Sequence, residues 1–218
     1  MLMGLLTLVR HFASYTPNRV RMFRIENNGL LVVARQTRPA AQARVTEPSE
    51  EALLVKAVRH GQQEAFANLY RLYAPMVHGI VLARVPWAEV DDLVQDVFVA
   101  ALKKINTLRD DSAFGAWLAM IARNRSMDFH RRKRETEELS DDLASHSRFE
   151  TDQDAANVLE VICGLPEAYR ETLVLRLVEG MTGPEIADRT GLTPASVRVN
   201  LHRGMKLLRE QLHMEEQL

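Results

Sequence analysis

Two stretches of the sequence concentrate side chains that can bind phosphate groups. Residues 123–134 contain six arginine or lysine residues against one aspartate, and residues 198–210 contain four against one glutamate. Guanidinium and ammonium groups at this density attract polyanions, so the chemistry that they indicate is binding to nucleic acid. A solvated helix face explains a single basic cluster about equally well. Two such clusters in separate modules favour nucleic acid.

The sequence shows no arrangement typical of catalysis or of a metal site. It has no Ser/His/Asp or Cys/His pattern and no phosphate-binding loop, and His60, His78 and His130 lack the spacing of metal ligands. Cys163 is the single cysteine and lies in an apolar run, so we expect a small buried residue rather than a redox sensor. We therefore expect no catalytic residue, no metal, no cofactor and no small-molecule substrate.

The composition predicts a soluble protein that is mostly helical. Of the 218 residues, 46% are hydrophobic and 26% are charged, and the helix-favouring residues Ala, Leu, Arg and Glu dominate. No stretch approaches the roughly 20 apolar residues that span a bilayer. The short apolar run at residues 1–9 precedes its basic residues, whereas a secretory signal has the opposite order. We expect a cytoplasmic protein without membrane insertion.

Changes in charge and periodicity divide the chain into segments. Residues 1–48 form an arginine-rich extension, and residues 49–134 show helical periodicity. Residues 135–154 carry a net charge of −7 without periodic apolar residues, which predicts a flexible acidic linker. A second helical module spans residues 155–212, before a tail at residues 213–218. The predicted fold is all-α, with two small helical domains joined by the linker.

The clearest helix of the first module is predicted over residues 88–105. Its apolar residues recur at i, i+3, i+4 and i+7, which makes one face a core stripe. The opposite face carries Asp91, Asp92, Gln95 and Asp96. On pattern alone, a solvated helix start stabilised by the helix dipole is the commoner explanation of this face. The functional alternative is a docking surface for a basic partner helix.

Proline and capping residues predict the other boundaries of the first module. Ser49 is a candidate N-cap, and Pro75 is expected to interrupt a helix or to begin a new one. A loop at residues 106–112 should end at Ser112, the expected N-cap of a helix over residues 113–133. On that helix the aromatic residues are expected to be core. The polar residues between them suit unstacked bases, because amides form hydrogen bonds with base edges.

The second module ends in a helix-turn-helix pattern. A short helix at residues 184–190 begins with proline, Gly191 provides the turn, and Leu192 is the expected buried anchor. Thr193 should cap a second helix through about residue 210, whose exposed start fits the major groove. A helical hairpin that does not bind DNA is the alternative for this motif alone.

These motifs, taken together and in this order, resemble the extracytoplasmic-function (group IV) sigma factors over about residues 50–212. In the first module the matching residues are Asp92-Leu93-Val94-Gln95-Asp96-Val97-Phe98, Phe114-x-x-Trp117-Leu118-x-x-Ile121-Ala122-x-Asn124, Asp128 and Arg131-Arg132. In the second module they are Leu165-Pro166 with Arg170, Gly180-Met181-Thr182 before Glu185-Ile186-Ala187, and Gly191-Leu192-Thr193 followed by residues 196–204.

The resemblance implies a sigma-2-like domain and a sigma-4-like domain that bind core RNA polymerase and direct it to promoter DNA. It implies docking on the β′ clamp helices through Asp92, Gln95 and Asp96, and a contact with the β flap. It implies capture of melted bases of the −10 element by Arg109, Asn124, Arg125, Asp128 and Arg131. It implies reading of the −35 element by Ser196, Arg198, Val199, Asn200, His202 and Arg203. An anti-sigma factor is implied as a further partner.

Some residues depart from the family pattern, and two other function classes stay open. Residues 1–48 match no family motif, and Asn200 and Gly204 stand where many members carry a basic residue and alanine. Gly204 also weakens its helix by about 1 kcal/mol relative to alanine. The open classes are a stand-alone helix-turn-helix regulator and a protein-interaction module without a DNA role. The acidic face favours the sigma factor, because a simple repressor has no need of it.

Overall fold

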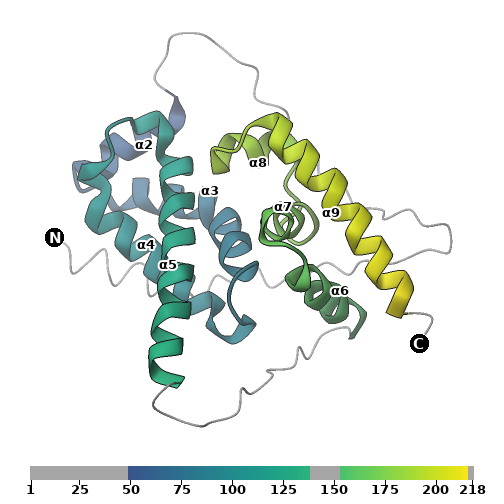
Figure 1. Ribbon diagram of the computed structural model, residues 1–218. Helices are drawn as coiled ribbons and strands as arrows, with labels where there is room; N and C mark the ends of the chain where they lie inside the picture. Colours follow the sequence, from purple (N-terminus) through teal and green to yellow (C-terminus); the bar gives the residue numbers. More distant parts are fainter. Residues whose placement is uncertain (1–48, 138–152, 216–218) are drawn as a thin grey trace.

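Helices make up all the regular structure in the described part of the chain (Figure 1). The computed structural model describes residues 49–137 and 153–215, so the predicted N-terminal extension, most of the predicted linker and part of the tail lie outside the described residues. The first module contains α2 (Glu50–Arg59), α3 (Gln63–Leu82), α4 (Val90–Lys104) and α5 (Phe114–Glu137). The second contains α6 (Gln153–Gly164), α7 (Glu167–Leu177), α8 (Gly183–Thr190) and α9 (Pro194–Glu215). Three 3-10 turns lie in the first module: η1 (Trp87–Glu89), η2 (Ile105–Thr107) and η3 (Asp111–Ala113).

The predicted all-α fold is confirmed, with differences at element ends. The predicted helix over residues 88–105 is α4 preceded by η1, and the predicted loop at residues 106–112 contains the two turns η2 and η3. At its C-terminal end α5 reaches Glu137, and α6 begins at Gln153. Both ends of the predicted linker are therefore helical.

The core of the first module forms around α3, which packs against α2, α4 and α5. Aromatic rings join these helices: the Phe66 and Phe98 ring centroids lie 6.4 Å apart, and those of Tyr73 and Phe114 lie 5.3 Å apart, both edge to face. Phe66, Phe98 and Phe114 are each at most 2% exposed. Burial of such a side chain stabilises the fold by about 1.5–3 kcal/mol.

Pro75 neither ends a helix nor begins one, contrary to the prediction. It lies inside α3, which continues for seven residues beyond it to Leu82. A proline in a helix interior costs about 3 kcal/mol through a lost hydrogen bond and a ring clash. On the turn that follows, Met76, Val77 and Ile80 are completely buried. The burial of these three side chains outweighs the cost of the proline.

Side chains cap the helix starts in both modules. Ser49 Oγ accepts a hydrogen bond from the Ala52 amide, as predicted. Asp110, and not Ser112, caps the 3-10 turn η3 that leads into α5: one carboxylate oxygen of Asp110 accepts from the Ser112 amide at 3.0 Å and from its hydroxyl at 2.6 Å. A carboxylate is the stronger acceptor, and Asp110 has the extended backbone that a cap requires.

The helix-turn-helix of the second module forms as predicted. Thr182 and Glu185 form a capping box at the start of α8, and Gly191 ends the helix with φ of 74°. Thr193 Oγ1 accepts from the Ser196 amide at 3.1 Å and caps α9. The expected buried anchor, Leu192, is only partly buried.

Gly204 has a packing role that its helix propensity alone does not reveal. A Cβ atom at this position would lie 2.9 Å from Leu173 Cδ1 and 3.1 Å from Tyr169 Cβ, both on α7. The missing side chain therefore allows α9 to approach α7 closely. This packing offsets the weakness of glycine in a helix.

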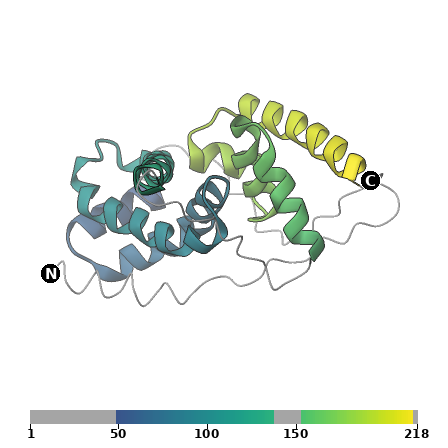
Figure 2. The same ribbon diagram turned by 60° about the horizontal axis from the view of Figure 1, so that its bottom comes forward.

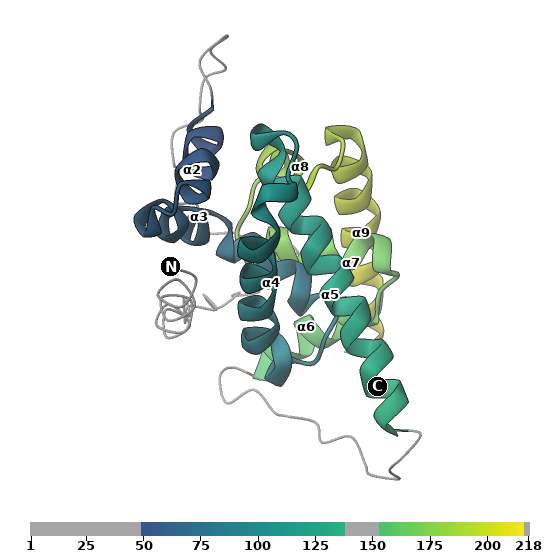
Figure 3. The same ribbon diagram turned by 90° about the vertical axis from the view of Figure 1, so that its left-hand side faces the viewer.

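The two modules pack directly against each other. Helix α3 contacts α7, and α5 contacts α8, so that the second module lies beside the first (Figure 2). Figure 3 shows α5 in front of α8. Two glycines allow a close approach: a Cβ atom on Gly79 would lie 2.7 Å from Leu175 Cδ2, and one on Gly191 would lie 2.8 Å from Ala116 Cβ. We call this contact region, in which α3 and α5 of the first module pack against α7 and α8 of the second, the seam.

Candidate nucleic-acid and partner interfaces

The acidic face of α4 lies opposite its buried stripe. Asp91, Asp92 and Asp96 are exposed and Gln95 is half-buried, while Val97 and Phe98 are completely buried. The helix period produces this division, because apolar and acidic residues fall on opposite sides. The first two aspartates lie in the first turn, where the helix dipole favours negative charge. The acidic face therefore lies on the outside of the first module, opposite the core, as the sequence pattern predicts.

The polar face of α5 combines charged groups with exposed methionines. Asn124 is exposed, Arg125 is half-buried, and Asp128 forms an ion pair of 3.0 Å with Arg131. Met120 and Met127 are 49% and 59% exposed. Sequence reasoning missed both methionines. The available signal was their spacing, four residues before and three residues after Asn124, which places them on the same helix face.

The loop before α5 is fixed to α2 by one arginine. Arg59 donates to the backbone carbonyl oxygens of Ile105 and Leu108, and its Nη1 lies 2.7 Å from Asp111 Oδ1. Arg109 is exposed on this loop. At the start of α5, Glu51 Oε1 accepts from the Gly115 amide at 2.9 Å, and burial raises the pKa of Glu51. The loop therefore has a defined position beside α5.

The start of α9 presents its side chains to solvent. Ser196, Arg198, Val199, His202 and Arg203 are exposed, and Asn200 is half-buried. Val197 and Leu208 hold the other side of the helix in the core, with exposures of 1% and 2%. In Figure 1, α9 lies on the side of the second module that faces away from the first. The predicted reading surface is therefore accessible.

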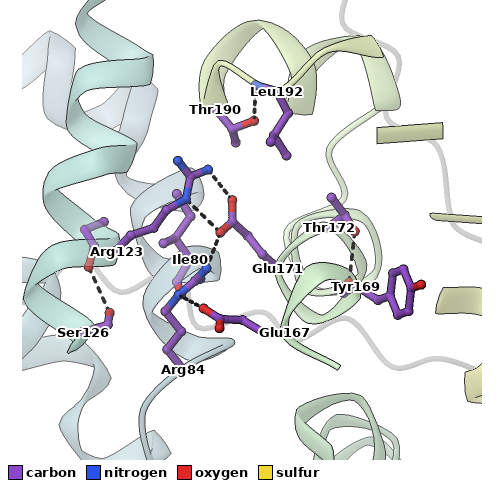
Figure 4. A network of polar contacts seen from close by, with 11 residues as sticks. Ile80, Arg84, Arg123, Ser126, Glu167, Tyr169, Glu171, Thr172, Thr190 and Leu192 are labelled. Carbon is purple, nitrogen blue, oxygen red and sulfur yellow. Dashed lines mark hydrogen bonds and ion pairs between the residues drawn. The ribbon is translucent and has the colours of Figure 1, made fainter. Parts of the chain in front are cut away.

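A buried carboxylate joins the two modules at the seam (Figure 4). Glu171 of α7 accepts two hydrogen bonds from Arg123 of α5, at 2.6 and 3.0 Å, and one from Arg84 at 2.7 Å. Burial opposes ionisation of Glu171, but the bonds and charges of Arg123 and Arg84 hold its pKa below the ordinary value. Arg123 is therefore engaged in the seam, although its sequence position placed it in a basic cluster.

Other polar contacts extend the seam. His78 Nδ1 lies 2.6 Å from Glu179 Oε1, and Arg189 donates to the Leu72 carbonyl oxygen at 2.9 Å. Burial lowers the pKa of His78, but the hydrogen bond and charge of Glu179, together with the charge of Asp91, raise it, and the net shift is upward. Cys163, which we expected to be buried, is only half-buried at the edge of the seam, and burial raises the pKa of its thiol.

Comparison with known families identifies both modules. The sequence model described as "Sigma-70 region 2" matches residues 69–136, and that described as "Sigma-70, region 4" matches residues 155–208. The RNA polymerase sigma factor CarQ of Myxococcus xanthus is 31% identical over 161 residues, which cover 71% of this chain and 92% of CarQ. The chain is an extracytoplasmic-function sigma factor of the sigma-70 family.

Further relatives agree with this assignment. The ECF RNA polymerase sigma factor SigW of Bacillus subtilis is 28% identical over 178 residues, which cover 72% of this chain and 94% of SigW. The solved structure of CnrH in complex with the cytosolic domain of CnrY matches with a TM-score of 0.55 and 27% identity, over 75% of this chain and 97% of CnrH.

The family determines the class of function. As a sigma factor, the protein directs core RNA polymerase to promoter DNA, and the alternative of a stand-alone helix-turn-helix regulator is not favoured. The family is one of transcription initiation factors rather than enzymes. Among the described helices, none has the length and apolar character to cross a membrane. Groups of side chains suited to a metal ion are likewise absent from the described residues.

Proposed function

We propose that three exposed surfaces divide the work of this sigma factor, and that the acidic face of α4 binds core RNA polymerase. Asp92, Gln95 and Asp96 contact the clamp helices of the β′ subunit. The exposure of both aspartates beside a buried stripe supports this role, because a basic partner helix can approach without disturbing the core. Complementary charge accelerates and orients such an encounter.

The polar face of α5 captures bases of the melted −10 element. The binding residues are Arg109, Asn124, Arg125, Asp128 and Arg131. The amide of Asn124 can donate to and accept from a base edge, while the arginines bind backbone phosphates. Exposed Met120 and Met127 add adaptable apolar surface against base faces. Contacts with the flipped bases offset an unstacking cost of a few kcal/mol.

The start of α9 reads the −35 element in the major groove. The reading residues are Ser196, Arg198, Val199, Asn200, His202 and Arg203. An arginine can form two hydrogen bonds with guanine O6 and N7, and exposed Val199 can contact a thymine methyl group. In the same module, we expect a contact with the β flap of the polymerase. The domains extend over residues 49–134 and 155–212 in this proposal.

An anti-sigma factor is the proposed regulatory partner. The similar protein CnrH has been solved in complex with the cytosolic domain of CnrY. A partner of this kind would hold the sigma factor away from the polymerase by covering the surfaces described above.

The presence of both sigma-70 regions in one chain, together with the exposed acidic face of α4, carries the proposal. The test is promoter-specific run-off transcription with purified core RNA polymerase. Asp92→Arg combined with Asp96→Arg should abolish both transcription and co-elution with the core. The control Glu160→Arg changes an exposed acid on α6 and should preserve both.

Two results would overturn these assignments. If the doubly substituted protein supports transcription at the wild-type rate, the acidic face of α4 does not bind the polymerase. Tight binding of the wild-type protein to duplex DNA, without any polymerase-dependent transcription, would instead favour a stand-alone regulator.

A further inference from the structure

A hollow of about 540 Å³ lies where the two modules meet. Its lining includes Arg84, which follows α3, Ser126, His130, Arg131 and Arg134 of α5, and Glu167 and Arg170 of α7. Figure 4 shows three of these residues, Arg84, Ser126 and Glu167, on three different segments around the end of the seam. The hollow therefore requires both modules in their packed arrangement.

The lining is strongly basic. It contains four arginines and one carboxylate, that of Glu167, which lies 3.5 Å from Arg84 Nε. Two of the arginines are engaged, because Arg84 binds Glu171 and Arg131 pairs with Asp128. Neighbouring carboxylates thus balance only part of the positive charge. An anion entering the hollow would meet a net positive field.

Arg170 carries a buried donor that has no acceptor among the described residues. Its Nε atom is buried without a hydrogen-bond partner. Buried polar groups almost always have a partner, so an unsatisfied buried donor on a charged group is unfavourable. Arg170 therefore contributes to the lining a guanidinium whose Nε has no acceptor among the described residues.

The start of α7 adds to this positive field. Glu167 and Arg170 lie in the first turn of this helix of 11 residues, and its N-cap is Pro166, which has no side-chain acceptor. Uncapped first-turn amides and the helix dipole favour an anion at this end. Arginines also suit phosphate in particular, because the guanidinium forms paired hydrogen bonds with phosphate oxygens.

We propose that this hollow binds a small anion carrying two or more phosphate groups. Pockets for small molecules have volumes of about 300–1,000 Å³, so its size suits such a ligand rather than a single ion. Because residues of both modules line the hollow, the ligand binds only the packed arrangement. It would shift the protein toward that arrangement by mass action. The hollow shares Arg131 and Met127 with the surface proposed for the −10 element, and its other lining residues lie outside the three surfaces of the proposed function.

Isothermal titration calorimetry with sodium pyrophosphate, on the full chain at constant ionic strength, tests the proposal. Saturable binding of one pyrophosphate per chain is expected, and orthophosphate should bind at least tenfold more weakly. Arg170→Gln and Arg134→Gln should each weaken pyrophosphate binding about tenfold. The control Arg209→Gln removes an exposed arginine on α9 and should leave binding unchanged. Arg134 is exposed, so its substitution keeps the test valid even if Arg170→Gln fails to fold.

Several outcomes would overturn the proposal. The first is the absence of saturable pyrophosphate binding to the wild-type protein. The second is wild-type affinity for pyrophosphate in both Arg170→Gln and Arg134→Gln. The third is a loss of affinity in the control Arg209→Gln as large as that in the two hollow variants. A parallel titration with ADP shows whether a nucleoside attached to the diphosphate strengthens binding. If ADP binds the same site, Arg170→Gln must also weaken the binding of ADP. A signal seen only with single-stranded DNA would assign the arginines to nucleic acid instead. Because polymerase and promoter are absent from the titration, its result is independent of the transcription test.

Discussion

Replacement of Glu171 by glutamine should separate the two modules. The substitution keeps the size of the side chain but removes the negative charge that two guanidinium groups share. Glu171 has a side-chain exposure of 7%, against 11% for Arg84 and 28% for Arg123. Glu171 and Arg84 are therefore shielded from water and Arg123 is partly exposed, so the substitution would leave the two arginines as like charges without their shared carboxylate.

The size of the effect follows from the contacts that are lost. Breaking a buried ion pair by removing one partner costs about 3–5 kcal/mol. Arg84 retains its weaker contact with Glu167 at 3.5 Å, so we expect the lower end, about 3 kcal/mol. At about 1.4 kcal/mol per tenfold change, this shifts the equilibrium between packed and separated modules roughly 100- to 200-fold. The loss should affect the seam first, because Glu171 faces the other module.

Small-angle X-ray scattering and urea unfolding measure the two consequences. The Glu171→Gln protein should have a larger radius of gyration than wild type and a lower unfolding midpoint. The control Glu210→Gln removes an exposed carboxylate 3.8 Å from Lys206 and should change stability by less than about 1 kcal/mol. If Glu171→Gln keeps both the wild-type radius and midpoint, the ion-pair network does not hold the seam.

Further predictions concern pH, packing and promoter contacts. The pKa of His78 is raised above its ordinary value of 6.5. The stabilisation from its pair with Glu179 is therefore complete below pH 6.5 and is lost as the pH rises through the folded-state pKa. The urea unfolding midpoint should fall between pH 6 and 9, and His78→Gln should remove this pH dependence. Gly204→Ala should destabilise the protein by about 1 kcal/mol. The added methyl group overpacks the contact with α7, at a cost of about 1–3 kcal/mol, which exceeds the gain in helix propensity of about 1 kcal/mol. A higher melting temperature of the variant would contradict this prediction. Asn124→Ala should weaken open-complex formation in permanganate footprinting but leave duplex −35 binding intact, and an unchanged footprint would remove its base contact. Arg203→Ala should cost about 1–3 kcal/mol at one −35 position in binding assays with single-base variants, whereas a uniform loss would indicate a phosphate contact.

Local sequence signals predicted much of the helical architecture. The period of apolar residues placed α4 within two residues of its observed ends, and glycine and threonine marked the turn and cap of the helix-turn-helix. These features depend on neighbouring residues, so the sequence contains them directly. The same signals failed at Pro75, where burial on the next turn outweighs the local cost of proline.

The seam could not be predicted from the sequence. Glu171 lies 48 residues from Arg123 and 87 from Arg84, and no periodic pattern indicates which distant helices meet. For the same reason Arg123 was grouped with the basic residues at 123–134, although its guanidinium is occupied by Glu171. The exposed surfaces of α4, α5 and α9 were predictable because each lies opposite an apolar stripe on its own helix.

The hydrogen bonds between Arg59 of α2 and the loop before α5 determine how far the first module can be shortened at its N-terminal end. Arg59 lies ten residues before the stretch that matches region 2, yet it binds the carbonyl oxygens of Ile105 and Leu108. A fragment cut to residues 69–136 would discard this anchor and the first helical turns of α3. Fragments prepared for promoter-melting experiments should therefore begin at or before Ser49, so that Arg109 is presented in its native position.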